Sequence, residues 1–216
     1  ILQEPKVDFY GQHVAVVVAE TYEQARYAAE LVKVNYEPLP AMVDFDAHKG
    51  EAVEPQRGRG SKRGDFDAAF VAAEHKVDQT YLTPVYHHQP LEPHSTIAVW
   101  EGGKLTLYNA SQVVNGVQNA IAAVFGLKPA DVHVVTPHVG GGFGSKGSAW
   151  PHVVLAAMAA KLVNRPVKLA LTRQNMFNSV GLRQRNVQHV RLAASAEGKL
   201  TAIGHETTTH TAVTGE

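Results

Sequence analysis

A run of glycines in the middle of the chain constrains the backbone more than any other segment. Residues 139–147 read VGGGFGSKG, with four glycines among residues 140–144. Glycine adopts positive φ without a steric penalty and leaves open the space that a side chain would fill. A β-rich run (132–136) precedes the loop and an apolar helical pattern (149–163) follows it. Backbone amides at such a strand-to-helix turn suit an anionic group, so we favour contact with a ligand. The alternative is a tight turn that packs the helix closely against a sheet.

Two phosphate-binding motifs come close to this loop, but neither fits it. Residues 142–147 spell GxGxxG, the dinucleotide-binding fingerprint, which also needs an acidic residue near the end of the next strand. No Asp or Glu occurs between Gly147 and Arg173. A P-loop needs Gly before its Lys and Ser or Thr after it, whereas Ser145 precedes Lys146 and Gly147 follows it. A non-catalytic α/β module that binds a nucleotide through residues 142–147 stays open as the alternative function.

The hydrophobic pattern predicts a mixed α/β fold of the α+β class, because strand-like and helical segments follow one another between turn residues. We expect strands at 14–19, 33–37, 77–83, 94–100, 105–109, 132–136, 167–171, 187–193 and 200–210, and helices at 22–32, 65–74, 111–125 and 149–163. Thr21 and Gln24 predict a capping box, residues 101–104 predict a hairpin turn, and Gly126 predicts a helix C-cap. The last helix is apolar nearly all round, which predicts burial within a larger assembly than one face of a sheet.

Composition and charge narrow the classes of function. Among the 216 residues, 20 basic side chains balance 20 acidic ones, which argues against a nucleic-acid-binding protein. Residues 46–64 are polar, rich in glycine and locally basic, so we place a linker there, between a domain at 1–45 and a second domain at 65–216. The RGRG sequence at 57–60 is also typical of RNA-binding tails, but a single copy favours a solvated linker.

Several residue types and motifs are missing from the sequence. Their absence excludes some kinds of site and does not determine the cellular compartment. The chain has no cysteine, which excludes disulfides and cysteine-ligated iron–sulfur clusters in this chain. Its 12 histidines include no HExxH motif, and we predict no metal site made of protein ligands. No apolar run reaches the roughly 18 residues that a membrane helix needs. The first residues carry neither an initiator Met nor a signal pattern, so we expect a processed chain or a piece of a longer one, in the cytoplasm or the periplasm.

Several segments resemble, in the same order, the molybdenum-binding large subunit of the xanthine dehydrogenase/aldehyde oxidase family. The glycine loop is similar to the VGGGFGGK loop of that family. The other matching segments are GQHVA at 11–15, YEPLP at 36–40, LEPH at 91–94, SQ at 111–112 and RPVK followed by Arg at 165–173. The resemblance covers nearly the whole chain and is strongest to bacterial aldehyde oxidase-type subunits.

This resemblance implies a fold, an activity and a set of partners. Residues 1–45 would be the end of an α/β hammerhead domain, and residues 65–216 the first part of a molybdopterin-binding domain. The implied activity is oxidation of aldehydes or N-heterocycles with water as the oxygen source. The implied cofactor is a molybdopterin dinucleotide in its cytosine form, with iron–sulfur clusters and FAD on partner subunits. The general-base glutamate of the family lies in a C-terminal segment that nothing here matches, so we expect this chain to be inactive alone.

The resemblance also implies the residues of the site. Gln112 matches the glutamine that hydrogen-bonds an oxo ligand of the molybdenum. Phe143 and Gly144 match loop residues whose backbone amides face the metal ligands. Gly141 and Gly142 would allow the loop to approach the pterin.

Two further positions bear on the substrate. Arg183 aligns with an arginine near the substrate pocket, where it would stabilise a developing oxyanion or orient an acidic substrate. The alternative interpretation is a surface arginine at the end of a strand. Gly147 stands where purine-oxidising members carry Glu, which disfavours a purine substrate.

Overall fold

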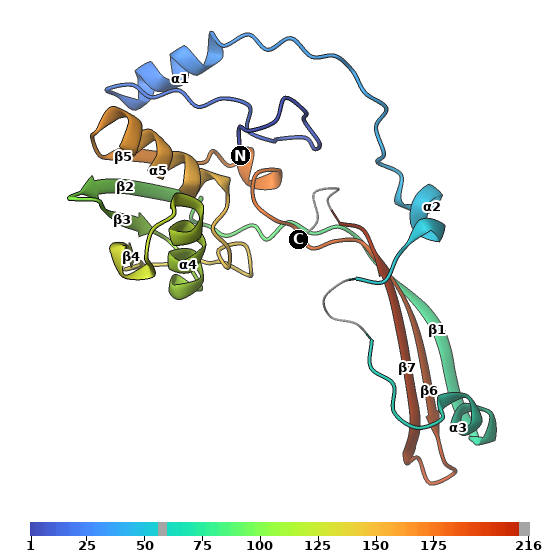
Figure 1. Ribbon diagram of the computed structural model, residues 1–216. Helices are drawn as coiled ribbons and strands as arrows, with labels where there is room; N and C mark the ends of the chain where they lie inside the picture. Colours follow the sequence, from blue (N-terminus) through green and yellow to red (C-terminus); the bar gives the residue numbers. More distant parts are fainter. Residues whose placement is uncertain (56–59, 212–216) are drawn as a thin grey trace. The chain divides into compact units, whose positions relative to one another are not determined.

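The structure, a computed structural model, describes residues 1–55 and 60–211 and forms two compact units (Figure 1). The first unit comprises residues 1–37 and 87–182, and the second comprises residues 38–86 and 183–216. Most of the RGRG sequence in the expected linker lies outside the described residues. None of the described helices is long and apolar enough to cross a membrane. Each compact unit joins two separate stretches of chain, and the predicted boundary at 46–64 stays a prediction.

A four-stranded sheet forms the centre of the first unit. Its strands are β2 (Ser95–Glu101), β3 (Lys104–Asn109), β4 (Val132–Val135) and β5 (Val167–Ala170), in the order β4-β3-β2-β5. β3 and β4 are parallel, and the other two pairs are antiparallel. Gly102 and Gly103, with φ values of 55° and 81°, make the tight turn of the β2–β3 hairpin that the sequence predicts, because a two-residue turn of this hand needs positive φ.

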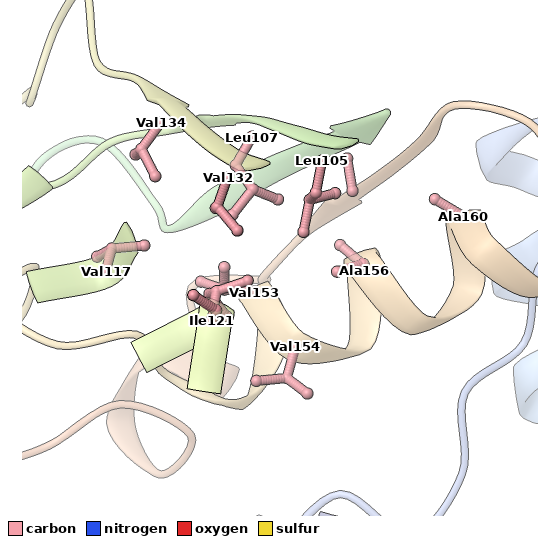
Figure 2. Packing of buried hydrophobic residues seen from close by; sticks show 13 residues of the cluster. Leu105, Leu107, Val117, Ile121, Val132, Val134, Val153, Val154, Ala156 and Ala160 are labelled. Carbon is pink, nitrogen blue, oxygen red and sulfur yellow. The ribbon is translucent and has the colours of Figure 1, made fainter. Parts of the chain in front are cut away.

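Two helices cover one face of this sheet and enclose the core with it (Figure 2). α4 (Val114–Phe125) ends at Gly126, whose φ of 65° makes it the left-handed C-cap that the sequence predicts. α5 (Pro151–Val163) begins with proline, which suits a first helical position because that amide needs no partner. Alternate residues of the strands face the helices. The buried cluster includes Leu105, Leu107, Val132 and Val134 from the sheet, Val117 and Ile121 from α4, and Val153, Ala156 and Ala160 from α5.

The burial of α5 needs no larger assembly, contrary to the prediction. Residues 152–157, together with Ala159 and Ala160, are already buried within the described chain. A second small cluster of Leu171, Met176 and Val180 packs near the start of the helix, against Trp150. A short 3₁₀ helix, η3 (Asn175–Phe177), carries part of that cluster. Packing within the described chain therefore explains the apolar character of α5 as far as Ala160, whereas Leu162 in its last turn is 82% exposed.

The N-terminal segment contains the predicted helix but neither predicted strand. α1 (Tyr22–Glu30) has the expected capping box, in which the Gln24 amide donates to the Thr21 hydroxyl and the Gln24 side chain accepts from the Thr21 amide. The strands predicted at 14–19 and 33–37 are wrong, since both segments carry no strand and are largely exposed. A strand needs a hydrogen-bonded neighbour, and no described strand pairs with either segment.

The second unit is built on a three-stranded antiparallel sheet. Its strands are β1 (His75–Thr83), β6 (Asn186–Ala194) and β7 (Leu200–Thr209), in the order β1-β6-β7. α3 (Phe66–Ala72), capped by Asp65, packs Phe66 against Gly204 of β7 and beneath Arg191 of β6. The remaining short elements are α2 (Phe45–His48), η1 (Lys49–Glu51) and, in the first unit, η2 (Pro129–Asp131). The other predicted helices and strands are confirmed to within a few residues.

Candidate functional site

The glycine loop adopts a backbone that few other sequences would tolerate. Gly140, Gly141 and Gly144 have φ values of 60°, 87° and 102°, a region that favours glycine. Phe143 also has a positive φ of 55°, which is uncommon for a bulky residue. Its side chain is 63% exposed. Local backbone strain of this kind gathers at binding and catalytic sites, so the geometry supports a loop built for ligand contact.

Gln112, directly before α4, is hydrogen-bonded to the loop in one orientation. Its Oε1 accepts from the backbone N–H of Gly144 at 3.0 Å and from that of Lys146 at 3.2 Å. Its own backbone N–H donates to the Lys146 carbonyl at 2.8 Å. Two N–H groups donate to this end of the side-chain amide, so it must be the oxygen. The hydrogen bonds therefore fix the –NH₂ group at the other end. Nε2 makes no hydrogen bond to another described residue, and Gln112 is exposed.

Gly142 must be glycine because of Gln112, and not because of its backbone. A Cβ at Gly142 would lie 2.4 Å from both Cδ and Oε1 of Gln112. Its φ is outside the positive region that the neighbouring glycines occupy. Gly141 combines a positive φ with contacts, since a Cβ there would lie 3.3 Å from the Phe143 ring. The loop is thus shaped as much by the amide of Gln112 as by glycine flexibility.

The amide of Gly144 differs from its predicted role. We expect it from the sequence to face the metal ligands, but its N–H donates to Gln112 Oε1. Ser145 and Gly147 amides donate within the loop, to the carbonyls of Gly142 and Gly144. The side-chain amide of Gln112 is one donor that the described contacts leave for a ligand, because the two loop amides bond to its Oε1.

An ion pair between a buried lysine and a partly exposed glutamate, which the sequence does not predict, lies behind the loop. The Lys146 side chain is 0% exposed, and its Nζ lies 2.6 Å from Glu92 Oε2. The same Nζ donates to the carbonyl of Val139. A Cβ at Gly140 would lie 2.4 Å from Glu92 Cβ, so glycine there allows the acidic side chain to reach the lysine. Two features of the sequence point to these residues. One is a lysine within a loop of small residues, and the other is the acidic residue of the LEPH segment.

His94 and Trp150 hold the end of the loop from the other side. His94 Nε2 donates to the Ser145 carbonyl at 3.0 Å, and Trp150 Nε1 donates to the same oxygen. Burial lowers the pKa of His94, so the neutral imidazole with its proton on Nε2 makes this bond. His152, in edge contact with His94, is buried enough that its pKa falls to about 3. Both rings leave Nδ1 without a described partner.

Four of the six segments that carry the family resemblance come together in the first unit. Arg173 donates to the carbonyls of Pro90 and Leu91, each at 2.7 Å. The Glu92 amide donates to the Gly140 carbonyl at 3.1 Å. Segments that lie 20 to 80 positions apart in the sequence therefore meet around one loop: LEPH, the SQ pair, the glycine loop and the arginine after RPVK.

Arg183 belongs to the second unit, whereas Gln112 and the glycine loop belong to the first. Its backbone pairs with that of Tyr86, with N–H to O distances of 2.7 and 3.0 Å. The structure thus brings together five of the six predicted site residues, namely Gln112, Gly141, Gly142, Phe143 and Gly144. The role of Arg183 stays a prediction.

The site offers hydrogen-bond donors instead of metal ligands. No group of three or more His, Cys, Asp or Glu side chains in residues 1–55 and 60–211 could hold a metal ion. The –NH₂ group of Gln112 and a loop without side chains at 140–142 suit a cofactor that brings its own metal ligands and offers oxygen acceptors. Similarity to known proteins identifies the class of cofactor.

Residues 48–216 match the molybdopterin cofactor-binding domain family, and residues 1–40 match the a/b hammerhead domain of aldehyde oxidase and xanthine dehydrogenase. The chain belongs to the xanthine dehydrogenase/aldehyde oxidase family. It is 40% identical over 207 residues to the aldehyde oxidoreductase molybdenum-binding subunit PaoC of Escherichia coli, covering 95% of this chain and 28% of that one. It is 32% identical over 214 residues to the 6-hydroxypseudooxynicotine dehydrogenase complex subunit gamma of Paenarthrobacter nicotinovorans, covering 95% and 27%.

A solved structure shares the fold. The aldehyde oxidoreductase of Desulfovibrio gigas superposes with a TM-score of 0.74 and 30% identity, over 88% of this chain and 22% of that one. The chain therefore spans about a quarter of the length of its relatives. Its family, its α+β fold and its molybdopterin-binding character are confirmed. The relatives are molybdenum oxidoreductases, and several are subunits of larger complexes.

Proposed function

We propose that this chain supplies the loop and the glutamine that hold the molybdenum cofactor of an aldehyde-oxidising hydroxylase. The observation that carries the proposal is that only the oxygen end of the Gln112 side chain is hydrogen-bonded to the loop. Two backbone amides occupy Oε1, so both N–H bonds of Nε2 are free to donate to an oxygen acceptor of the cofactor. The loop at 140–142 carries no side chain, and this allows the pterin to lie against its backbone.

When bound, the cofactor would supply a two-electron oxidation of the aldehyde, in which water provides the added oxygen and two protons are released as the acid forms. The residues of this chain bind and orient the cofactor. A preorganised donor in a site of this kind stabilises developing negative charge without reorganisation during the reaction. Gln112 is held by backbone atoms alone, which gives its amide that preorganisation.

An aldehyde is the favoured substrate class for two reasons. The relative at 40% identity is an aldehyde oxidoreductase subunit. Gly147 has no side chain at the position where purine-oxidising members carry Glu, so no carboxylate there can contact a heterocycle. We assign Arg183 to the substrate pocket, where it would orient an acidic group or stabilise an oxyanion. N-heterocycles are the second candidate, since a relative at 32% identity is named for a heterocyclic compound.

The partners follow from the chemistry of electron transfer. With no cysteine in the chain, the iron–sulfur clusters that take up electrons would be carried elsewhere. We assign them and FAD to partner subunits, and we assign the cofactor to the cytosine dinucleotide form. The general base also lies outside residues 1–216, so the 216-residue chain alone should not oxidise an aldehyde.

Metal and nucleotide analysis of the purified complex that contains the complete subunit tests the proposal. We expect about one molybdenum per subunit, CMP released on acid hydrolysis, and faster oxidation of an aromatic aldehyde than of xanthine. Absence of molybdenum together with tight NAD(P) binding would instead support the alternative of a nucleotide-binding module. Turnover of aldehyde by the isolated 216-residue chain would refute its predicted inactivity.

A further inference from the structure

Lys146 connects the buried part of the site with the part that faces a ligand. Its main chain makes two hydrogen bonds with Gln112, one to Oε1 at 3.2 Å and one from the Gln112 amide at 2.8 Å. Its side chain, 0% exposed, reaches in the other direction to Glu92 Oε2 at 2.6 Å. A movement of this one residue would therefore shift the Gln112 amide.

The same side chain ties the two ends of the glycine loop together. Nζ of Lys146 donates to the carbonyl of Val139, seven residues earlier. Between them lie four residues with positive φ, three of which are glycine. Glycine has the widest conformational freedom of any residue, so ordering this stretch costs more entropy than ordering an ordinary loop. The ammonium group supplies the cross-link that offsets this cost.

Glu92 is itself held in place from two sides. Its backbone N–H donates to the Gly140 carbonyl at 3.1 Å. Arg173 fixes the carbonyls of the two preceding residues, Pro90 and Leu91, each at 2.7 Å. Gly140 leaves the room that the acidic side chain needs, since a Cβ there would lie 2.6 Å from Oε2 of Glu92. The carboxylate is thus directed at the lysine from a supported backbone.

We propose that Lys146 is a positioning residue, whose buried side chain pairs with Glu92 and holds the glycine loop so that the Gln112 amide faces the cofactor. The inference rests on the proposed function, because it concerns the same Gln112 donor. Removing the Glu92 charge leaves the buried Lys146 cation without its partner, which is strongly disfavoured. Removing the lysine charge takes away its contacts with Glu92 and the Val139 carbonyl, so either change should release the loop. Lys146 is not required to touch the cofactor in this account.

The experiment compares four forms of the complete subunit in its complex: the wild type, Lys146→Met, Glu92→Gln and the double variant. Each is prepared with cofactor, and also without it from a host that cannot make the pterin. Hydrogen exchange is followed at the amides of Gly144 and Lys146, and molybdenum per subunit is measured. Glu20→Gln is the matched control, because Glu20 pairs with Arg165 at the same 2.6 Å but is exposed.

In the cofactor-free protein, both single variants should exchange these two amides at least about tenfold faster than the wild type. Molybdenum content should fall by more than half in the loaded preparations. The double variant should match Lys146→Met instead of adding the two effects, because both substitutions remove one interaction. Glu20→Gln should leave exchange and metal content unchanged.

Three results would overturn the inference. The first is wild-type exchange and molybdenum content in both single variants. The second is an increase in exchange that is equal in the loop and in β2 and β3, which would make the pair a support of the fold alone. The third is additivity in the double variant. If Lys146→Met fails to fold, Glu92→Gln still decides, because the Glu92 side chain is 41% exposed. A wild-type complex without molybdenum would refute the proposed function, while exchange in the cofactor-free protein would still test Lys146.

Discussion

At the scale of single residues, two backbone amides determine which end of the Gln112 side chain is available to a ligand. Gly144 and Lys146 donate to Oε1, and a glutamate at this position could accept both bonds equally well. The difference between the two side chains is confined to the other end, where –NH₂ donates and a carboxylate oxygen cannot. The substitution of Gln112 by Glu therefore keeps the hydrogen bonds that support the loop and removes only the donor that faces the cofactor.

We predict that Gln112→Glu keeps the molybdenum content of the complex but lowers kcat for an aldehyde by roughly 10²-fold, the usual loss when one preorganised donor is removed. Gln112→Ala should lower both, because it also removes the acceptor of the two loop amides. Steady-state kinetics with metal analysis measures this. Wild-type kcat in fully loaded Gln112→Glu would remove the amide from the catalytic site.

Gly142 gives a second residue-scale prediction. Its Cβ would lie 2.4 Å from Gln112 Cδ, so Gly142→Val should displace the Gln112 side chain and abolish retention of the cofactor. The cause is this collision and the loss of approach space, not the positive φ that a glycine run predicts. Gly50→Ala is the control, since nothing lies within 4 Å of a Cβ there. A Gly142→Val complex with full molybdenum content would make the loop purely structural.

Buried histidines predict how stability depends on pH. Burial lowers the pKa of His152 to about 3 and also lowers the pKa of His94 and His13. In the unfolded chain these histidines have the ordinary pKa of about 6.5 and bind protons below that pH. In the folded chain His152 stays neutral until about pH 3. The free energy of unfolding must then decrease as the pH falls through this window.

For His152 alone, the expected loss between pH 8 and pH 5 is about 2 kcal/mol. Denaturant unfolding of the subunit at several pH values measures it. His152→Phe should remove that part of the slope and keep stability at pH 8, because the Nδ1 of His152 has no described partner to lose. An unchanged slope in this variant would show that His152 is not the responsible group.

At the scale of elements, helix α4 shows which predictions a hydrophobic pattern can support. The pattern places Val113, Val117, Ile121 and Val124 on one face. Of these four, only Val117 and Ile121 are buried, while Val113 is 49% and Val124 is 58% exposed. Periodicity gives the direction of the apolar face. It does not show where the sheet that covers this face ends, because that depends on tertiary packing.

We predict that Ile121→Ala lowers the free energy of unfolding by about 2–5 kcal/mol, since Ile121 of α4 is fully buried in the cluster that α5 and the sheet also form. Val124→Ala, on the same helix, should change it by less than about 0.5 kcal/mol. Urea titrations of both variants compare them directly. Equal effects would contradict the packing in Figure 2.

The two strands predicted in the N-terminal segment fail for a related reason. Val14 to Val18 has strand-like composition, yet Val14, Val16 and Val18 are 36–42% exposed. Composition describes how well a residue fits a pleated surface, whereas a strand exists only where another strand pairs with it. The capping box of α1 and the hairpin turn at Gly102–Gly103 are predicted correctly, because both are complete within a few residues.

At the scale of the whole molecule, sequence order and resemblance were enough to predict the family and the loop that carries the site. Local patterns could not predict the pairing of Glu92 with Lys146, which lie 54 positions apart. They also could not predict that Arg173 fixes the backbone before Glu92. Such long-range contacts depend on the arrangement of the four-stranded sheet and become visible only when the chain is folded.

The same limit applies to Arg183. It is assigned to the pocket by resemblance, and it lies in the second compact unit of the chain. Gln112 and the glycine loop lie in the first unit, where their mutual contacts are defined. The proposed contact with the cofactor therefore depends on the Gln112 network and not on Arg183.

Locating the metal in the cofactor-loaded complex tests the central claim most directly. Anomalous diffraction at the molybdenum edge gives the position of the metal relative to the chain. The account predicts one molybdenum per subunit, on the side of the glycine loop to which Nε2 of Gln112 points. A molybdenum centre bound elsewhere, with Gln112 Nε2 facing only solvent, would contradict it.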